Sequence, residues 1–221
     1  MINGINSREM ILEILLEIEE GEHSHVAIRN ALSKYQFLPK QDRAFITRVC
    51  EGTLEYRIQI DYIINSFSKV TVDKMKPAIR EILRSAVYQL KYMDSVPDSA
   101  VCNEAVKLAQ RKGFYNLKPF VNGVLRTIAR EMDQVRFPQK EDDLLKYLSV
   151  KYSMPEVLVT RWLEAYGEET TEKILADFLT EHPLTIRCRT YLNSKEEVIK
   201  SLESQGVHVA PAPYLPYAYS I

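Results

Sequence analysis

The sequence predicts a mainly α protein, in which a compact helical bundle is followed by a small helical segment and the start of an incomplete α/β unit. Over the first 130 residues, apolar side chains recur at the three- and four-residue spacing of amphipathic helices. At 184–190 the stretch LTIRCRT instead alternates between apolar and polar residues, which is typical of a strand. Seven short amphipathic helices with short connections favour a bundle.

Signals for helix starts and ends place the first four helices. Asn6 with Glu9 forms an N-cap pattern, and Gly21 is suited to end the helix that follows. This helix should bury a stripe of apolar side chains, Met10, Ile11, Ile14, Leu15 and Ile18. The next three helices are expected over 24–32, from Pro39 through Leu54, and over about 59–67.

Prolines mark the beginnings of two later helices. A fifth helix is expected from Thr71 to about Met93, where Pro77 is tolerated only within the first turn. A sixth is expected from Asp98 to Gly113. The seventh has Pro119 in its first turn and should bury five apolar residues, Phe120, Val121, Val124, Leu125 and Ile128.

The remainder of the chain changes character twice. Residues 132–143 are polar and predict a linker, and two or three helices follow over about 144–179, with Trp162 and Tyr166 expected in their core. After the strand at 184–190, a capping box predicts a helix that ends at Gly206, and VHV at 207–209 predicts a second strand. The final PAPYLPYAYSI closes no sheet, so we expect a unit that begins and does not finish, as in a truncated chain.

Composition excludes several classes of protein. No apolar stretch approaches the roughly 18 residues that a membrane helix needs, and the first residues show no secretion signal. The seven glycines form no phosphate-binding loop, so no nucleotide cofactor is expected in this chain, and the four histidines have no partners at metal-ligand spacing. The three cysteines, Cys50, Cys102 and Cys188, are expected in apolar cores of a protein from the reducing cytoplasm.

Positive charge is concentrated in one segment. Residues 1–130 contain 19 basic and 15 acidic residues, whereas the rest of the chain is net acidic. Within 103–130 the only acid is Glu104, and helical spacing places the basic side chains opposite the apolar stripes, with Phe114, Tyr115 and Asn122 nearby. Such a face suits the phosphate backbone of RNA. Its members are Lys107, Arg111, Lys112, Lys118, Arg126 and Arg130, with Arg8 at the start of the first helix and Arg80, Arg84 and Lys91 on the fifth.

A second interpretation stays open, because solvent-exposed helix faces are usually charged. Arg126 or Arg84 would then be paired internally, for instance with Glu104. The first helix is acidic and would repel phosphate, so an RNA-binding face should lie elsewhere.

The order of several motifs resembles a known family. VPDSAVCNEAVKLAQRKG and KPFVNGVLRTIAR, with REMILEIL at 8–15 and LRSAVYQLKYMDSVP at 83–97, resemble the NusB-like helical domain at the front of bacterial 16S rRNA cytosine-C5 methyltransferases of the Sun/RsmB type. HPLTIRCRT looks like the strand that enters the family's ferredoxin-like RNA-binding subdomain, although Thr190 stands where Asn is expected. The resemblance implies a NusB-like domain over 1–135, a small helical linker domain over 136–181 and the start of a ferredoxin-like subdomain over 182–221.

The resemblance also implies a function. The chain would bind 16S rRNA through the basic face, with a second surface at Arg187 and Arg189, for a catalytic domain that binds S-adenosylmethionine and carries two catalytic cysteines. The three cysteines of this chain match neither motif, so no catalytic, cofactor-binding or metal-binding residue is assigned here. Two alternatives are an antitermination factor of the NusB type, without enzymatic activity and with an unidentified protein partner, and a helical protein-interaction module without an RNA role.

Overall fold

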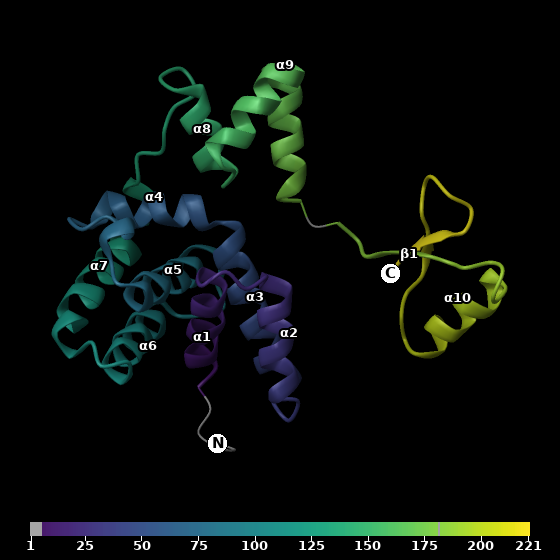
Figure 1. Ribbon diagram of the computed structural model, residues 1–221, viewed down its shortest axis with the longest axis horizontal. Helices are drawn as coiled ribbons and strands as arrows, with labels where there is room; N and C mark the ends of the chain where they lie inside the picture. Colours follow the sequence, from purple (N-terminus) through teal and green to yellow (C-terminus); the bar gives the residue numbers. More distant parts are fainter. Residues whose placement is uncertain (1–5, 181) are drawn as a thin grey trace. The chain divides into compact units, whose positions relative to one another are not determined.

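The computed structural model describes residues 6–180 and 182–221, and the described residues form two compact units, which divide between Leu175 and Ala176 (Figure 1). The first unit begins with the seven helices that the sequence predicts, with one-turn 3-10 segments at Val72–Lys74, Tyr115–Leu117 and Met132–Gln134. The mainly α fold class is therefore confirmed. The helices are α1 (Ser7–Glu19), α2 (Ser24–Lys34), α3 (Lys40–Glu55), α4 (Arg57–Phe67), α5 (Pro77–Tyr92), α6 (Asp98–Arg111) and α7 (Lys118–Glu131).

Helix α5 lies at the centre of the bundle. It packs against α1, α3, α4, α6 and α7, and Ile82, Leu83 and Val87 are almost completely buried. The helix begins at Pro77, six residues later than expected, because Lys76 is extended, as the residue before a proline usually is. Residues 72–74 form a separate 3-10 turn instead. The predicted N-cap is confirmed, since the Asn6 side chain accepts hydrogen bonds from the backbone N–H groups of Arg8 and Glu9.

The segment at 132–143 is not a free linker, as the sequence suggested, but packs along the bundle. The Phe137 ring stacks on Tyr62 of α4 at 5.7 Å between centroids, and the Tyr62 hydroxyl donates to the backbone carbonyl of Arg136 at 2.7 Å. The aromatic and apolar side chains within this polar stretch, including Val135, hold it against the core. The packed segment connects the bundle to α8 (Leu144–Lys151) within the first unit.

Helices α8 and α9 (Glu156–Phe178) share a small second core, which consists of Leu148, Val159 and Leu175. Trp162 packs against this core as predicted, whereas Tyr166 is 56 % exposed, so its expected burial is wrong. The helical path is interrupted at Gly167, whose φ of 74° lies in the left-handed region that favours glycine. This break lets α9 change direction (Figure 1).

The second unit contains a three-stranded antiparallel sheet and helix α10 (Lys195–Ser204). The capping box of Ser194 and Glu197 is present. The strands are β1 (Thr185–Arg187), β2 (Ala210–Pro211) and β3 (Ala218–Ser220), so the second strand lies just after the predicted VHV. The expectation that the final residues close no sheet is wrong, because β3 is the central strand and pairs with both β1 and β2.

Candidate nucleic-acid interface

Helices α6 and α7 pack against each other and direct their predicted basic side chains away from the core. Their buried positions form the expected apolar stripes, which include Ala105 and Leu108 on α6 and Val124 and Leu125 on α7. Lys107, Arg111, Arg126 and Arg130 are exposed, while Lys112 and Lys118 are half-buried at the helix connection. We call the six residues, together with Arg8, the basic face.

Glu104 lies among three members of the basic face. Lys107 donates a hydrogen bond to Glu104 Oε1 at 2.8 Å. This hydrogen bond, with the positive charges of Lys107, Arg8 and Arg111, lowers the pKa of Glu104. The structure therefore brings Arg8, from the start of α1, close enough to act electrostatically on the same acid as α6. The grouping of Arg8 with the basic face was expected only from its position at the start of the first helix.

The basic face is not free of counterions, which corrects the expectation from sequence. The Lys112 Nζ lies 3.1 Å from Glu9 and 3.0 Å from Glu13 on α1. The Arg130 guanidinium lies 2.6 Å from its neighbour Glu131. The acids come from α1 and from the residue directly after the segment, so a count of acids within 105–130 missed them. Together with Lys107, three members are paired with carboxylates.

The remaining members contact amide groups or have no hydrogen bond or ion pair with the described residues. Arg126 donates to Asn122 at 2.9 Å and to Asn103 on α6 at 3.3 Å, which confirms the predicted neighbourhood of Asn122. Lys118 donates to the Gln110 side chain at 2.7 Å. Arg111 forms no hydrogen bond or ion pair with the described residues. Amide partners leave the positive charge of a side chain in place, so these residues remain suited to phosphate.

Arg8 is a half-buried member of the basic face. Its Nε donates to Gln89 on α5 at 3.2 Å, and its guanidinium lies 5.3 Å from the centroid of the Phe45 ring. Burial lowers its pKa, but an arginine remains charged at neutral pH. The hydrogen bond to Gln89 and the contact with the Phe45 ring fix the direction of the Arg8 guanidinium. The aromatic neighbours of the face differ, because Phe114 packs on the core and Tyr115 is 61 % exposed.

The cations of α5 do not belong to the basic face. Arg84 forms two hydrogen bonds to Asp61, at 2.7 and 2.6 Å, and a third to Glu81 at 2.6 Å. Arg80 is paired with Glu19 and donates to two backbone carbonyls. Lys91 lies over the rings of Tyr92 and Phe137, and burial lowers its pKa. For Arg84, the alternative of internal pairing is therefore correct, although its acids are Asp61 and Glu81.

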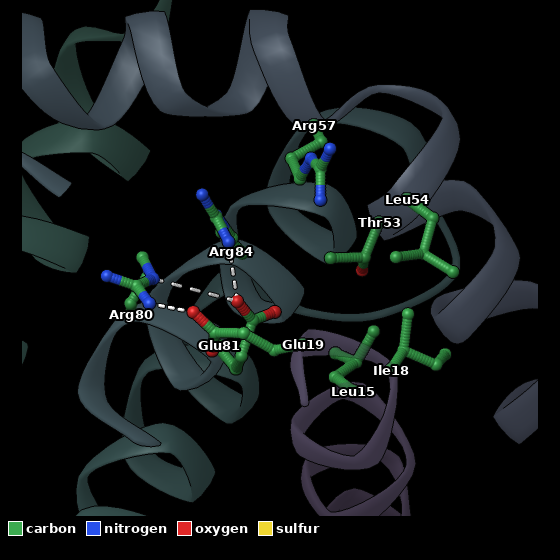
Figure 2. Close-up of a pocket in the computed structure, with 9 residues that line it drawn as sticks. All are labelled: Leu15, Ile18, Glu19, Thr53, Leu54, Arg57, Arg80, Glu81 and Arg84. Carbon is green, nitrogen blue, oxygen red and sulfur yellow. Dashed lines mark hydrogen bonds and ion pairs between the residues drawn. The ribbon is translucent and has the colours of Figure 1, made fainter. Parts of the chain in front are cut away.

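A polar cavity of about 300 Å³ adjoins these ion pairs (Figure 2). It lies between the end of α1, the junction of α3 and α4, and the first turns of α5. Arg57 is exposed and has no hydrogen bond or ion pair to the described residues. Thr53 is 1 % exposed, and its hydroxyl has no hydrogen-bond partner in the part of the chain that the structure describes. Sequence analysis missed this site because no local motif marks it.

The cysteines and the possible metal ligands form no further site among the described residues. All three cysteines are unpaired and buried as predicted, and burial raises the pKa of Cys50 and of Cys102, which keeps these thiols protonated. No group of three or more metal-ligating side chains occurs among the described residues. No helix in the described ranges is long and apolar enough to cross a membrane. In the second unit, Arg187 and Arg189 are both exposed.

Comparison with protein families assigns both parts of the chain. The model of the NusB family matches residues 5–130, which is more than half of the chain. The chain belongs to the NusB family. A second model, the ferredoxin-like domain of RsmF/B-like methyltransferases, matches residues 154–221. The combination that the sequence motifs suggested is therefore confirmed.

Curated relatives of two kinds are similar to this NusB-family chain. The probable ribosomal RNA small subunit methyltransferase B of Bacillus subtilis (strain 168) is 32 % identical over 91 % of this chain and 44 % of its own length. The corresponding Synechocystis protein (strain PCC 6803) is 30 % identical over 96 % of this chain and 47 % of its own length. The transcription antitermination protein NusB of Dictyoglomus thermophilum is 33 % identical over 58 % of this chain and 85 % of its own length. The chain thus spans about half the length of the two methyltransferase relatives.

Solved structures share the fold. The crystal structure of PH0851 aligns with a TM-score of 0.68 at 23 % identity, over 98 % of this chain and 48 % of that one. NusB of T. maritima aligns with a TM-score of 0.51 at 26 % identity, over 57 % of this chain and 92 % of that one. The first likeness covers both units of the chain, and the second covers the NusB-family part.

Proposed function

We propose that this chain is the RNA-binding portion of an S-adenosylmethionine-dependent 16S rRNA cytosine-C5 methyltransferase. The observation that carries the proposal is the order of two matched domains in one chain, a NusB-family domain followed by a ferredoxin-like domain of the RsmF/B type. In this proposal the chain positions rRNA in the cytoplasm, and the methyl donor and the catalytic cysteines belong to a domain outside this sequence. The division at 1–135, 136–181 and 182–221 stays a prediction.

The basic face is the proposed rRNA-contacting surface. Arg8, Lys107, Arg111, Lys112, Lys118, Arg126 and Arg130 would bind phosphates, and the exposed Tyr115 would lie beside an unpaired base. The exposed pairs of Lys107 with Glu104 and of Arg130 with Glu131 are weak obstacles, because surface ion pairs contribute at most about 1 kcal/mol. Lys112 has two acid partners and is expected to contribute least.

An antitermination factor is the second candidate, favoured by the similarity to NusB proteins over 58 % of the chain. That similarity accounts for the helical bundle and leaves residues 154–221 without a role. The RsmF/B-type match of exactly these residues supports the methyltransferase proposal instead.

Salt-dependent binding to 16S rRNA fragments tests the RNA-binding role. Each phosphate contact should contribute a slope of about −0.9 to −0.7 to the dependence of log affinity on log salt concentration. A triple variant in which Lys107, Arg111 and Arg126 are each replaced by Glu should bind RNA more weakly and show a flatter slope. Affinity that does not change in the triple variant would favour a protein-interaction module.

Glu104→Gln is the matched control for charge reversal. It removes the one negative charge that lies among Lys107, Arg8 and Arg111 without adding a positive side chain. If phosphates bind there, this variant should bind RNA more tightly and with the same or a steeper salt slope. Weaker binding would mean that RNA contacts another surface.

A further inference from the structure

The charges that line the cavity beside Arg57 are largely paired with one another or with a neighbouring acid. Arg80 is paired with Glu19, and Arg84 is paired with Glu81 and Asp61. Arg57, Arg80 and Arg84 line the cavity with Glu19 and Glu81, and Asp61, outside the lining, is the third carboxylate that matches the three guanidinium groups. A ligand with a double negative charge would therefore gain little there, whereas a neutral polar ligand requires no change in this balance.

Two hydrogen-bond donors at the cavity have no partner among the described residues. The Thr53 hydroxyl is buried, and Figure 2 shows its oxygen turned toward the space between Arg57 and Ile18. The exposed Arg57 guanidinium borders the same space. A buried hydroxyl without a partner destabilises a fold by about 1–3 kcal/mol. A ligand atom that accepts a hydrogen bond from Thr53 would remove this destabilisation.

Glu19 supplies a hydrogen-bond acceptor at the cavity. Its side chain is 27 % exposed, and a carboxylate offers about four lone-pair positions, so the ion pair with Arg80 leaves capacity for a further donor. Leu15, Ile18 and Leu54 supply an apolar wall beside these polar groups. The site therefore combines flat apolar contact with donors on one edge and an acceptor on another.

We propose that this cavity binds one unstacked nucleobase of single-stranded RNA, with Arg57 and Thr53 donating to ring acceptors and Glu19 accepting from an exocyclic amine. A nucleobase is planar, neutral and apolar on its faces, and the cavity volume of about 300 Å³ is at the lower end of small-ligand sites. Carboxylates accept from the cytosine N4 amine, and arginine donates to base acceptors and stacks on bases. This inference rests on the proposed RNA-binding function and adds a base-recognising site outside the basic face.

Neutral nucleosides test the site without using the basic face. The full 221-residue chain, with labelled Leu and Ile methyl groups, would be titrated with cytidine, uridine and ribose at high salt, where phosphate contacts are screened. We expect cytidine to shift the methyl signals of Leu15, Ile18 and Leu54 and to bind more tightly than uridine. Ribose should cause no shift.

Variants separate recognition from folding. Thr53→Val and Arg57→Ala should each weaken cytidine binding about tenfold, whereas Thr53→Ser keeps the hydroxyl and should bind normally. Arg126→Ala, on the basic face, should leave cytidine binding unchanged. Unchanged methyl signals with cytidine, or equal affinity in Thr53→Val, would overturn the nucleobase site even if rRNA binding through the basic face persists. Cytidine binding without salt-dependent rRNA binding would instead contradict the proposed function and support the nucleobase site.

Discussion

The ring of Tyr88 lies directly against the backbone of Gly52, so that a Cβ atom at residue 52 would overlap the ring. Both residues are buried, on α5 and α3 respectively, and Tyr88 also stacks with Tyr56 at 6.4 Å between centroids. The glycine thus sets how closely α3 approaches the central helix.

Gly52→Ala should destabilise the bundle by about 1–3 kcal/mol, because the Tyr88 ring is enclosed and cannot move without displacing its neighbours. Gly123→Ala on α7 is the matched control, since a Cβ there meets nothing within 4 Å. It should stabilise the protein by about 0.5–1 kcal/mol through helix propensity. Urea unfolding of both variants measures the difference, and equal effects would contradict the close packing.

Arg84 neutralises two acids within the bundle, and its removal should be costly. Arg84→Met would remove the ion-pair partner of Asp61 and leave the 4 %-exposed Glu81 side chain with only the 4.0 Å contact to Arg80, and it should cost about 3–5 kcal/mol. Adding Glu81→Leu should recover part of the loss, because burial already raises the pKa of Glu81 and disfavours its charge. Chemical unfolding of the single and double variants checks this order, and a double variant less stable than Arg84→Met would contradict it.

Glu172 should make stability depend on acidic pH. Hydrogen bonds from Lys151 first, and also from Lys140 and Tyr152, lower its pKa from 4.5 to about 2. Because the folded pKa is below the unfolded value, this stabilisation is present above about pH 4.5 and is lost as pH falls toward 2. Glu172→Gln should therefore reduce the loss of stability across this range.

Thermal unfolding between neutral pH and pH 2 measures the effect of Glu172. The control is Glu169→Gln, because Glu169 is 85 % exposed and its ion pair with Lys173 is at the surface. The melting temperatures of Glu172→Gln and Glu169→Gln should differ at neutral pH and become equal near pH 2. Parallel curves for Glu172→Gln and the unmodified chain would contradict the assignment.

Local signals in the sequence were sufficient for most of the helices. The N-cap of Asn6, the capping box of Ser194 and the prolines at 77 and 119 each act within one turn, and the structure contains each as expected. The expected start of α5 at Thr71 is wrong because Pro77 imposes an extended conformation on Lys76, so the helix cannot continue through that residue. The central position of β3 was missed because a short strand is defined by partners that lie elsewhere in the chain.

The candidate sites show the same division between local and distant effects. Helical spacing correctly placed Lys107, Arg111 and Arg126 on an exposed face. The acids that neutralise Lys112 lie about 100 residues away on α1, so no count within one segment could reveal them. The Thr53 and Arg57 cavity is formed by four helices, and its members have no common spacing.

The central position of β3 also has a consequence for the order of events during synthesis. β1 and β2 contact each other only through β3, which is the last of the three to leave the ribosome. The nascent chain therefore carries two strands without a template until Ala218–Ser220 emerges, and the sheet forms in one late step. Folding of the sheet in 176–221 therefore has to wait until Ala218–Ser220 has emerged, whereas the bundle of α1 to α7 can assemble earlier in synthesis.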